Sequence, residues 1–193
     1  MLSAGHFRFQ NLGVRTQHPE HHMNLYAATI PQFNRLLQNV ERWLDKAVAF
    51  AESKKFDPNT LLSARLAPDQ FSLVRQVQSV ADQAKLTVAR LTAKDPPKHP
   101  DTEQTIDELR KRLHSVISYL DTFKPADFEG AAERLISLPF FPEGKGMTGH
   151  DYLVERQLPN LYFHASMAYA ILRHNGVDVG KQDFIGQVTY QDK

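Results

Sequence analysis

Four separate segments of the chain repeat apolar residues at three- and four-residue intervals, and this periodicity constrains the fold more than any other feature. The segments lie at about 24–53, 69–91, 105–124 and 149–175. At this spacing the apolar side chains of a helix fall on one stripe along its surface. Four amphipathic helices bury such stripes best against one another. The sequence therefore predicts an all-α four-helix bundle.

Prolines and glycines mark the ends and bends of these helices. Three prolines within residues 94–100 end the second helix, and a short β-prone segment followed by prolines and glycines predicts a small hairpin or irregular crossover within 134–148. Pro31 either lies in the first turn of a helix capped by Thr29 or bends that helix. Pro159 should kink the last helix, and Gly176 should end it as a left-handed residue. The two long connections leave the order of up and down helices open.

Composition excludes several classes of function. Lys and Arg number 23 against 22 Asp and Glu, so the basic excess on which duplex binding depends is missing, and we expect no nucleic-acid partner. No apolar run approaches the roughly 20 residues that span a bilayer, so we expect no membrane partner and a cytoplasmic protein. The chain has no cysteine, which excludes thiolate ligands and nucleophiles.

The first 22 residues differ from the rest of the chain because they show no sustained helical period. We interpret 1–22 as a disordered extension, or as the product of a start codon assigned too early, and 23–193 as the single bundle domain. A transit peptide is the alternative, since such segments contain arginine and few acids. His18, His21 and His22 could bind zinc or nickel, but they are better explained as a solvated tail.

One polar pair on the last helix and another on the second are the candidate site. Asn160 and His164 are four residues apart, as are Gln78 and Asp82, so each pair projects from one face of its helix. If the two faces oppose each other, they form a polar pocket inside or at the mouth of the bundle, where bundles hold ligands and metals. The alternatives are a hydrogen-bonded core histidine at 164 and a solvated face on the second helix.

The remaining histidines and serines suggest no chemistry. His114 is expected on the surface of the third helix beside Arg112, and His174 with Arg173 suits the negative end of the last helix dipole. The serines show no base and orienting group, and no glycine-rich phosphate loop exists.

Six short segments together resemble an uncharacterised domain family of the DinB/YfiT-like metalloenzyme superfamily. They are 64–69 (ARLAPD), 76–78 (QVQ), 82–85 (DQAK), 159–164 (PNLYFH), 168–176 (AYAILRHNG) and 180–184 (GKQDF). The resemblance extends over about 23–186. It implies a four-helix bundle and frequent homodimers. In typical members it also implies a divalent metal held by three histidines, one on helix two and two in an H-x-x-x-H pair on the last helix, and some members are thiol-dependent transferases or isomerases.

On that resemblance His164 matches the second histidine of the pair, Asn160 replaces the first, and Gln78, or less surely Asp82, takes the helix-two position. Amide oxygens are weaker ligands than imidazole for zinc, nickel or iron. We therefore expect a homodimeric bundle that binds a small ligand or serves a structural role without a standard metal. A divalent-metal-dependent transferase or isomerase, with His164 and Asp82 as ligands, is one rival, and a non-catalytic dimeric interaction protein is another.

Overall fold

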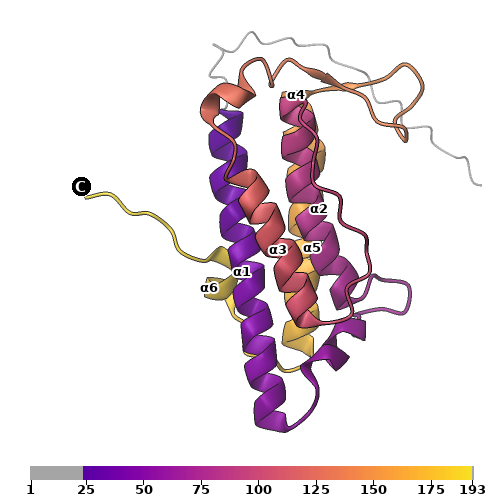
Figure 1. Ribbon diagram of the computed structural model, residues 1–193, viewed down its shortest axis with the longest axis vertical. Coiled ribbons are helices and arrows are strands. Elements are labelled where there is room, and N and C mark those ends of the chain that lie inside the picture. The colour runs from indigo at the N-terminus through magenta and orange to yellow at the C-terminus, as the bar shows by residue number, and fades with distance from the viewer. Residues whose placement is uncertain (1–23, 193) are drawn as a thin grey trace, which may run out of the picture.

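A computed structural model describes residues 24–192, so the predicted extension at 1–22 and its three histidines lie outside the described residues. The chain forms the long helices α1 (Leu25–Lys54), α2 (Leu73–Thr92), α3 (Ile106–Leu120) and α5 (Leu158–His174). Shorter elements join or follow them: η1 (Pro58–Ser63), η2 (Pro125–Phe128), β1 (Leu135–Ile136), β2 (Met147–Thr148), α4 (Gly149–Asp151), η3 (Tyr152–Gln157) and α6 (Lys181–Ile185). The predicted all-α four-helix bundle is confirmed (Figure 1).

The helices follow one another as down, up, up and down, so α2 and α3 run parallel (Figure 1). Contacts at the two ends agree with this order. The amide of Ile106, at the start of α3, donates to the Asn59 side chain of η1 over 2.9 Å, while Lys94, just after α2, pairs with Asp127 of η2 at 2.6 Å. A parallel pair needs a connection that runs the full length of the bundle. The proline-rich segment between α2 and α3 makes that connection.

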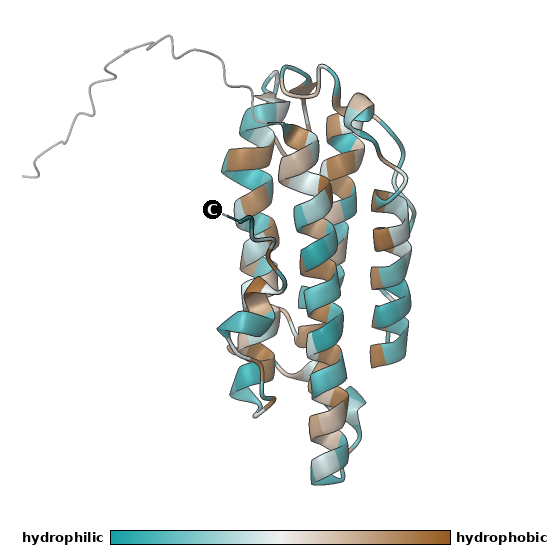
Figure 2. Ribbon diagram, turned by 90° about the vertical axis from the view of Figure 1, so that its left-hand side faces the viewer, coloured by the Kyte–Doolittle hydropathy of each residue, from teal (hydrophilic) through white to brown (hydrophobic). Residues whose placement is uncertain are grey.

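The core consists of the apolar stripes that the periodicity predicts, and polar and apolar residues alternate along each long helix (Figure 2). α2 packs against both α3 and α5 and is the central element. The hairpin predicted within 134–148 is present as the antiparallel pair β1–β2. No helix in the range 24–192 is both long and apolar enough to cross a membrane.

Three local features bear on the sequence-based expectation. The cap of α1 is Asn24, and Thr29 lies inside the helix, where its hydroxyl donates to the Leu25 carbonyl over 2.6 Å. α4, the π-helical turn η3 and α5 follow one another without a break, so Pro159 lies inside a continuous helical segment as expected, directly after the π turn. Gly176 has the expected positive φ, +94°.

The C-terminal tail, predicted to be irregular, contains the short helix α6. Its Phe184 ring stacks on the fully buried Trp43 of α1 at 5.4 Å between centroids, and the indole N–H of Trp43 donates to the Asp183 carbonyl over 3.0 Å. Lys46 of α1 and Asp183 form an ion pair at 2.8 Å. These contacts fix the tail against α1.

Candidate functional site

We name residues 93–105, the connection between α2 and α3, the strap, because it runs back along the bundle before α3 begins (Figure 1). Its prolines prevent a helix, and both of its ends are fixed. Ala93 ends α2 in the left-handed conformation with φ +55°. At the other end Thr105 and Glu108 form a capping box, in which each side chain accepts the other residue's amide proton.

A buried arginine joins α2, α3 and the strap. The Arg112 side chain of α3 is 1% exposed, and one nitrogen, Nη2, lies 2.7 Å from Asp82 of α2 and 3.0 Å from Asp101 of the strap. The other, Nη1, lies 2.9 Å from Glu103. A guanidinium without water is stable only when carboxylates surround it. These four residues, the Arg112 cluster, therefore hold the strap against the two helices.

Gln78 extends this cluster. Its amide nitrogen donates to Glu103 over 2.8 Å, and its oxygen accepts from Arg75 over 3.3 Å. Arg75 also pairs with Asp101. Burial alone would raise the pKa of the Glu103 carboxyl, but hydrogen bonds from Arg112, its own backbone and Gln78 hold that pKa below its usual value. Glu103 is therefore ionised at neutral pH and locks the end of the strap.

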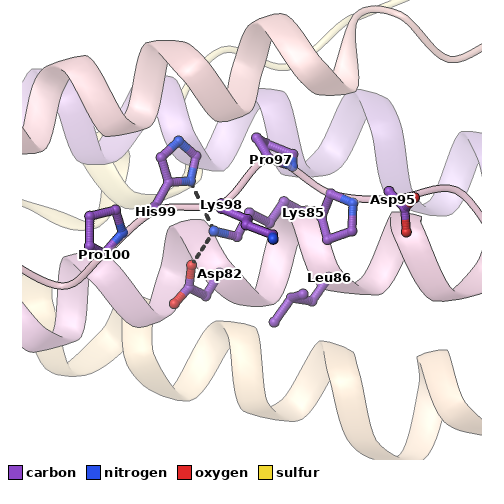
Figure 3. A pocket seen from close by; sticks show the side chains of 9 residues that line it. Asp82, Lys85, Leu86, Asp95, Pro97, Lys98, His99 and Pro100 are labelled. Atoms are coloured by element: carbon purple, nitrogen blue, oxygen red, sulfur yellow. Dashed lines mark hydrogen bonds and ion pairs between the residues drawn. The ribbon is translucent and has the colours of Figure 1, made fainter.

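A pocket of about 690 Å³ opens between α2 and the strap (Figure 3). It is lined by Asp82, Lys85, Leu86, Asp95, Pro96, Pro97, Lys98, His99 and Pro100. The Lys85 side chain is only 5% exposed, and its ammonium lies 2.8 Å from Asp82 and 2.9 Å from Nδ1 of His99. Prolines thus form apolar walls of an open pocket beside a small group of convergent polar atoms, which is the usual composition of a ligand site.

His99 is held as a neutral imidazole between α2 and α3. An ammonium only donates hydrogen bonds, so Nδ1 of His99 accepts from Lys85, and Nε2–H donates to the Ser115 hydroxyl at 3.0 Å. Burial lowers the pKa of His99, and the positive charges of Lys85 and Arg112 lower it further. The strap is therefore attached at its middle through an uncharged histidine.

His164 lies on another face of the bundle, where α5 packs against α2. Its Nδ1 is 2.8 Å from the side-chain oxygen of Gln76, whose nitrogen donates to the Phe71 carbonyl over 3.3 Å. This arrangement assigns the proton to Nδ1 and leaves a lone pair on Nε2. The Phe71 ring stacks on the imidazole at 6.2 Å between centroids. Burial lowers the pKa of His164, and the Arg75 charge contributes, so the ring is neutral at pH 7.

The structure therefore divides the four predicted site residues between two places. Gln78 and Asp82 face α3 and the strap, whereas His164, with Asn160 one turn before it on the same helix, belongs to the contact between α5 and α2. Successive residues of a helix differ by about 100°, so positions 76 and 78 point roughly 200° apart. Because Gln76 faces α5, Gln78 faces away from it, and the helix-two partner of His164 is Gln76.

Comparison with known proteins places the chain in a family. It matches the model of the domain of unknown function DUF1993 over residues 25–185. The chain belongs to the DUF1993 family. A crystal structure of a DinB family member protein from Shewanella denitrificans is 51% identical to it, with a TM-score of 0.85 and coverage of 88% of this chain and 96% of that one. DUF1993 is thus an uncharacterised branch of the DinB-like superfamily. No curated protein matches the chain.

The residues of this DUF1993 chain do not fit the tri-histidine metal site that the superfamily implies. The one imidazole at that place keeps a lone pair on Nε2, but the polar groups that would have to join it, Gln76 and Asn160, are neutral amides. Within residues 24–192 there is no group of three or more His, Cys, Asp or Glu side chains that could hold a metal ion. Imidazole and carboxylate sets suit divalent transition metals, and single imidazoles with amides do not.

Sequence reasoning missed the residues that contribute most to both places. They are Gln76, Lys85, His99 and Arg112. Arg112 was named only as the neighbour of His114, yet its side chain is buried, because the strap covers it and supplies two carboxylates. Two acidic residues directly after the prolines, Asp101 and Glu103, could have indicated a buried ion pair. The local sequence does not show which cation they contact.

Proposed function

We propose that this DUF1993 protein binds a small organic molecule in the pocket between α2 and the strap, without a tri-histidine metal centre. The observation that carries the proposal is the Lys85 ammonium, 5% exposed and placed in the wall of a pocket of about 690 Å³. Burial of a charge is costly, and the pocket groups Asp82 and His99 compensate for it. In a purely structural bundle, an apolar residue at position 85 would stabilise the fold at least as well without the cost of burying a charge.

The size and lining of the pocket support the same proposal. Its volume lies within the roughly 300–1,000 Å³ of typical small-molecule sites. Prolines at 96, 97 and 100 give rigid apolar walls, and rigid walls reduce the entropy lost when a ligand binds. Asp82, Lys85 and His99 form one polar end of the pocket, so they would orient a ligand that has one polar end (Figure 3).

A fragment screen by ligand-observed NMR on the full chain tests this proposal. We expect hits from a diverse library of small fragments, and we expect the Lys85→Met variant to lose them, because methionine keeps the apolar stem and removes the ammonium. The matched control is Lys111→Met, which removes an exposed lysine of α3. A library without hits, or hits that persist unchanged in Lys85→Met, would overturn the proposal.

We also propose that two copies of the chain associate through an aromatic surface on the α2–α5 side. Phe71 and Phe163 are 49% and 51% exposed, and both rings contact His164. Exposed clusters of large aromatic residues are typical of protein–protein contacts.

Light scattering during gel filtration tests this association. The wild-type chain should elute with the mass of a dimer, and Phe163→Glu should give a monomer, because it places a charge in the centre of the contact. Phe140→Glu, an exposed phenylalanine on the hairpin, is the control and should leave the dimer intact. A monomeric wild type would contradict the proposal.

A further inference from the structure

The hydrogen bonds that His99 already makes limit which ligands the pocket can bind. At neutral pH the ring accepts from Lys85 at Nδ1 and donates to Ser115 at Nε2, so both nitrogens are occupied. The Lys85 ammonium uses two of its three protons, on Asp82 and on His99. A ligand acceptor near Lys85 can therefore accept a hydrogen bond from the third ammonium proton. It can accept a second one if the hydrogen bond between Lys85 and His99 breaks.

The charges around His99 are balanced as long as the ring is neutral. The groups facing it from α2 are Lys85 and Asp82, from α3 Arg112, and from the strap Glu103. The wider cluster pairs three cations with three carboxylates, namely Lys85, Arg75 and Arg112 with Asp82, Asp101 and Glu103. A proton on His99 would add a positive charge that no carboxylate of this cluster balances.

Lys98 adds another cation on the same side. Its side chain is exposed, lines the pocket and extends over the stem of Lys85 in the close view (Figure 3). Asp95 lies at the opposite end of the pocket, away from His99 (Figure 3). Near His99 the pocket is lined by two lysines, Lys85 and Lys98, and by one carboxylate, Asp82, so protonation of His99 would add to an excess of positive charge at this end.

We infer that this end of the pocket binds a small anionic group, a carboxylate or an oxoanion, held by the ammonium groups of Lys85 and Lys98 and by the imidazolium of His99. The inference rests on the proposed function, because it names the ligand class of the same pocket. The anion would lie between the Lys85 ammonium and Nδ1 of His99, which are 2.9 Å apart, and would replace their direct hydrogen bond. Charge-assisted hydrogen bonds of this kind are about twice as strong as neutral ones.

Binding is then coupled to the uptake of one proton. While Nε2–H donates to Ser115, a neutral His99 has only a lone pair at Nδ1, which repels the anion. The imidazolium keeps the bond to Ser115 and adds a charged Nδ1–H donor, so protonated His99 binds the anion best. The apparent dissociation constant equals the intrinsic value divided by the protonated fraction. Above the pKa of His99, which burial and its cationic neighbours lower, affinity should therefore fall about tenfold for each pH unit.

Titration with sulfate and with benzoate between pH 5 and 8, followed by NMR of the His99 ring, tests the inference. Both probes stay ionised throughout this range, so any pH dependence belongs to the protein. We expect each probe to raise the pKa of His99 and to bind about tenfold more weakly per pH unit above it. Sulfate represents oxoanions, and benzoate represents carboxylates with an apolar body. The ratio of their affinities shows which of the two the pocket prefers.

Three variants complete the test. His99→Gln keeps an acceptor for Lys85 but does not titrate, so it should bind weakly and equally at every pH. Lys98→Met should weaken binding at every pH without removing its pH dependence. His114→Gln changes a histidine on the outer face of α3 and should behave as the wild type. Binding that is independent of pH in the wild type would overturn the inference, as would neutral fragments that bind at Lys85 while neither anion does. In that last outcome the proposed function would stand.

Discussion

Replacement of Arg112 by methionine should destabilise the protein far more than a surface arginine would. The Arg112 side chain is 1% exposed and contacts Asp82, Asp101 and Glu103 within 3.0 Å. Removal of one partner from a buried ion pair costs about 3–5 kcal/mol, since the remaining charge stays buried. Here each carboxylate keeps another partner and methionine fills much of the volume, so we expect the lower end, about 3 kcal/mol at pH 7. For a chain of this size that corresponds to a melting temperature lower by about 6–12 °C.

The loss should depend on pH with a defined sign. Burial would raise the pKa values of Asp101 and Glu103. Hydrogen bonds and charges from Arg75 and Arg112 instead lower the pKa of Asp101, and those chiefly from Arg112 lower the pKa of Glu103. A carboxyl group with a lowered pKa in the folded state stabilises the fold above its unfolded-state pKa and loses that contribution as pH falls through the folded-state value. The difference between wild type and variant should therefore be complete at pH 7 and shrink below about pH 4.

Urea unfolding followed by circular dichroism, at pH 7 and at pH 3.5, measures both effects. The matched control is Arg110→Met on the same helix, which removes pairs with Asp45 and Asp107 that are open to solvent and should cost about 0.3–1 kcal/mol. If Arg112→Met cost no more than Arg110→Met, or cost the same at both pH values, the Arg112 cluster would not hold the strap as described.

Three further outcomes follow from the described contacts. Gln76→Leu should cost about 1–3 kcal/mol in urea unfolding, because it leaves the half-buried Nδ1–H of His164 without its acceptor; an unchanged midpoint would remove Gln76 as the partner of His164. A chain without residues 1–22 should melt at the same temperature as the full chain, and a clear loss would show that this segment packs on the bundle. Elemental analysis of that shortened, tag-free chain should find no stoichiometric zinc, nickel or iron, whereas metal lost on His164→Ala would favour the metal-dependent alternative.

The bundle could be predicted from the sequence because its signal is local and repeated. Each long helix carries several turns of apolar spacing, so an error at one residue does not change the assignment. The helix α6 escaped prediction because five residues contain little more than one turn, too few for any period to show. Its stability comes from the contact between Phe184 and Trp43, which lie 141 positions apart in the chain (184 − 43).

The site was harder to predict, since it depends on which face of α2 meets which neighbour. Spacing shows that Gln78 and Asp82 share a face, and the structure keeps them together on the Arg112 cluster. Spacing does not show whether that face meets α5 or α3. Whether Gln76 or Gln78 contacts His164 depends on how α2 is rotated about its own axis. That rotation is set by the packing of α2 against both α3 and α5.

Electrostatics, more than apolar packing, fixes the shape of the pocket. Its outer wall is the strap, and the strap is attached through Asp101 and Glu103 to a guanidinium and through His99 to an ammonium. Few apolar side chains of the strap enter the core, so these charged contacts supply most of its attachment. Acid that protonates His99 would break its hydrogen bond with Lys85 but keep the one to Ser115, while the carboxylates, with their lowered pKa values, keep the end of the strap in place. The pocket should therefore respond to pH and salt over a range in which the helical core does not change.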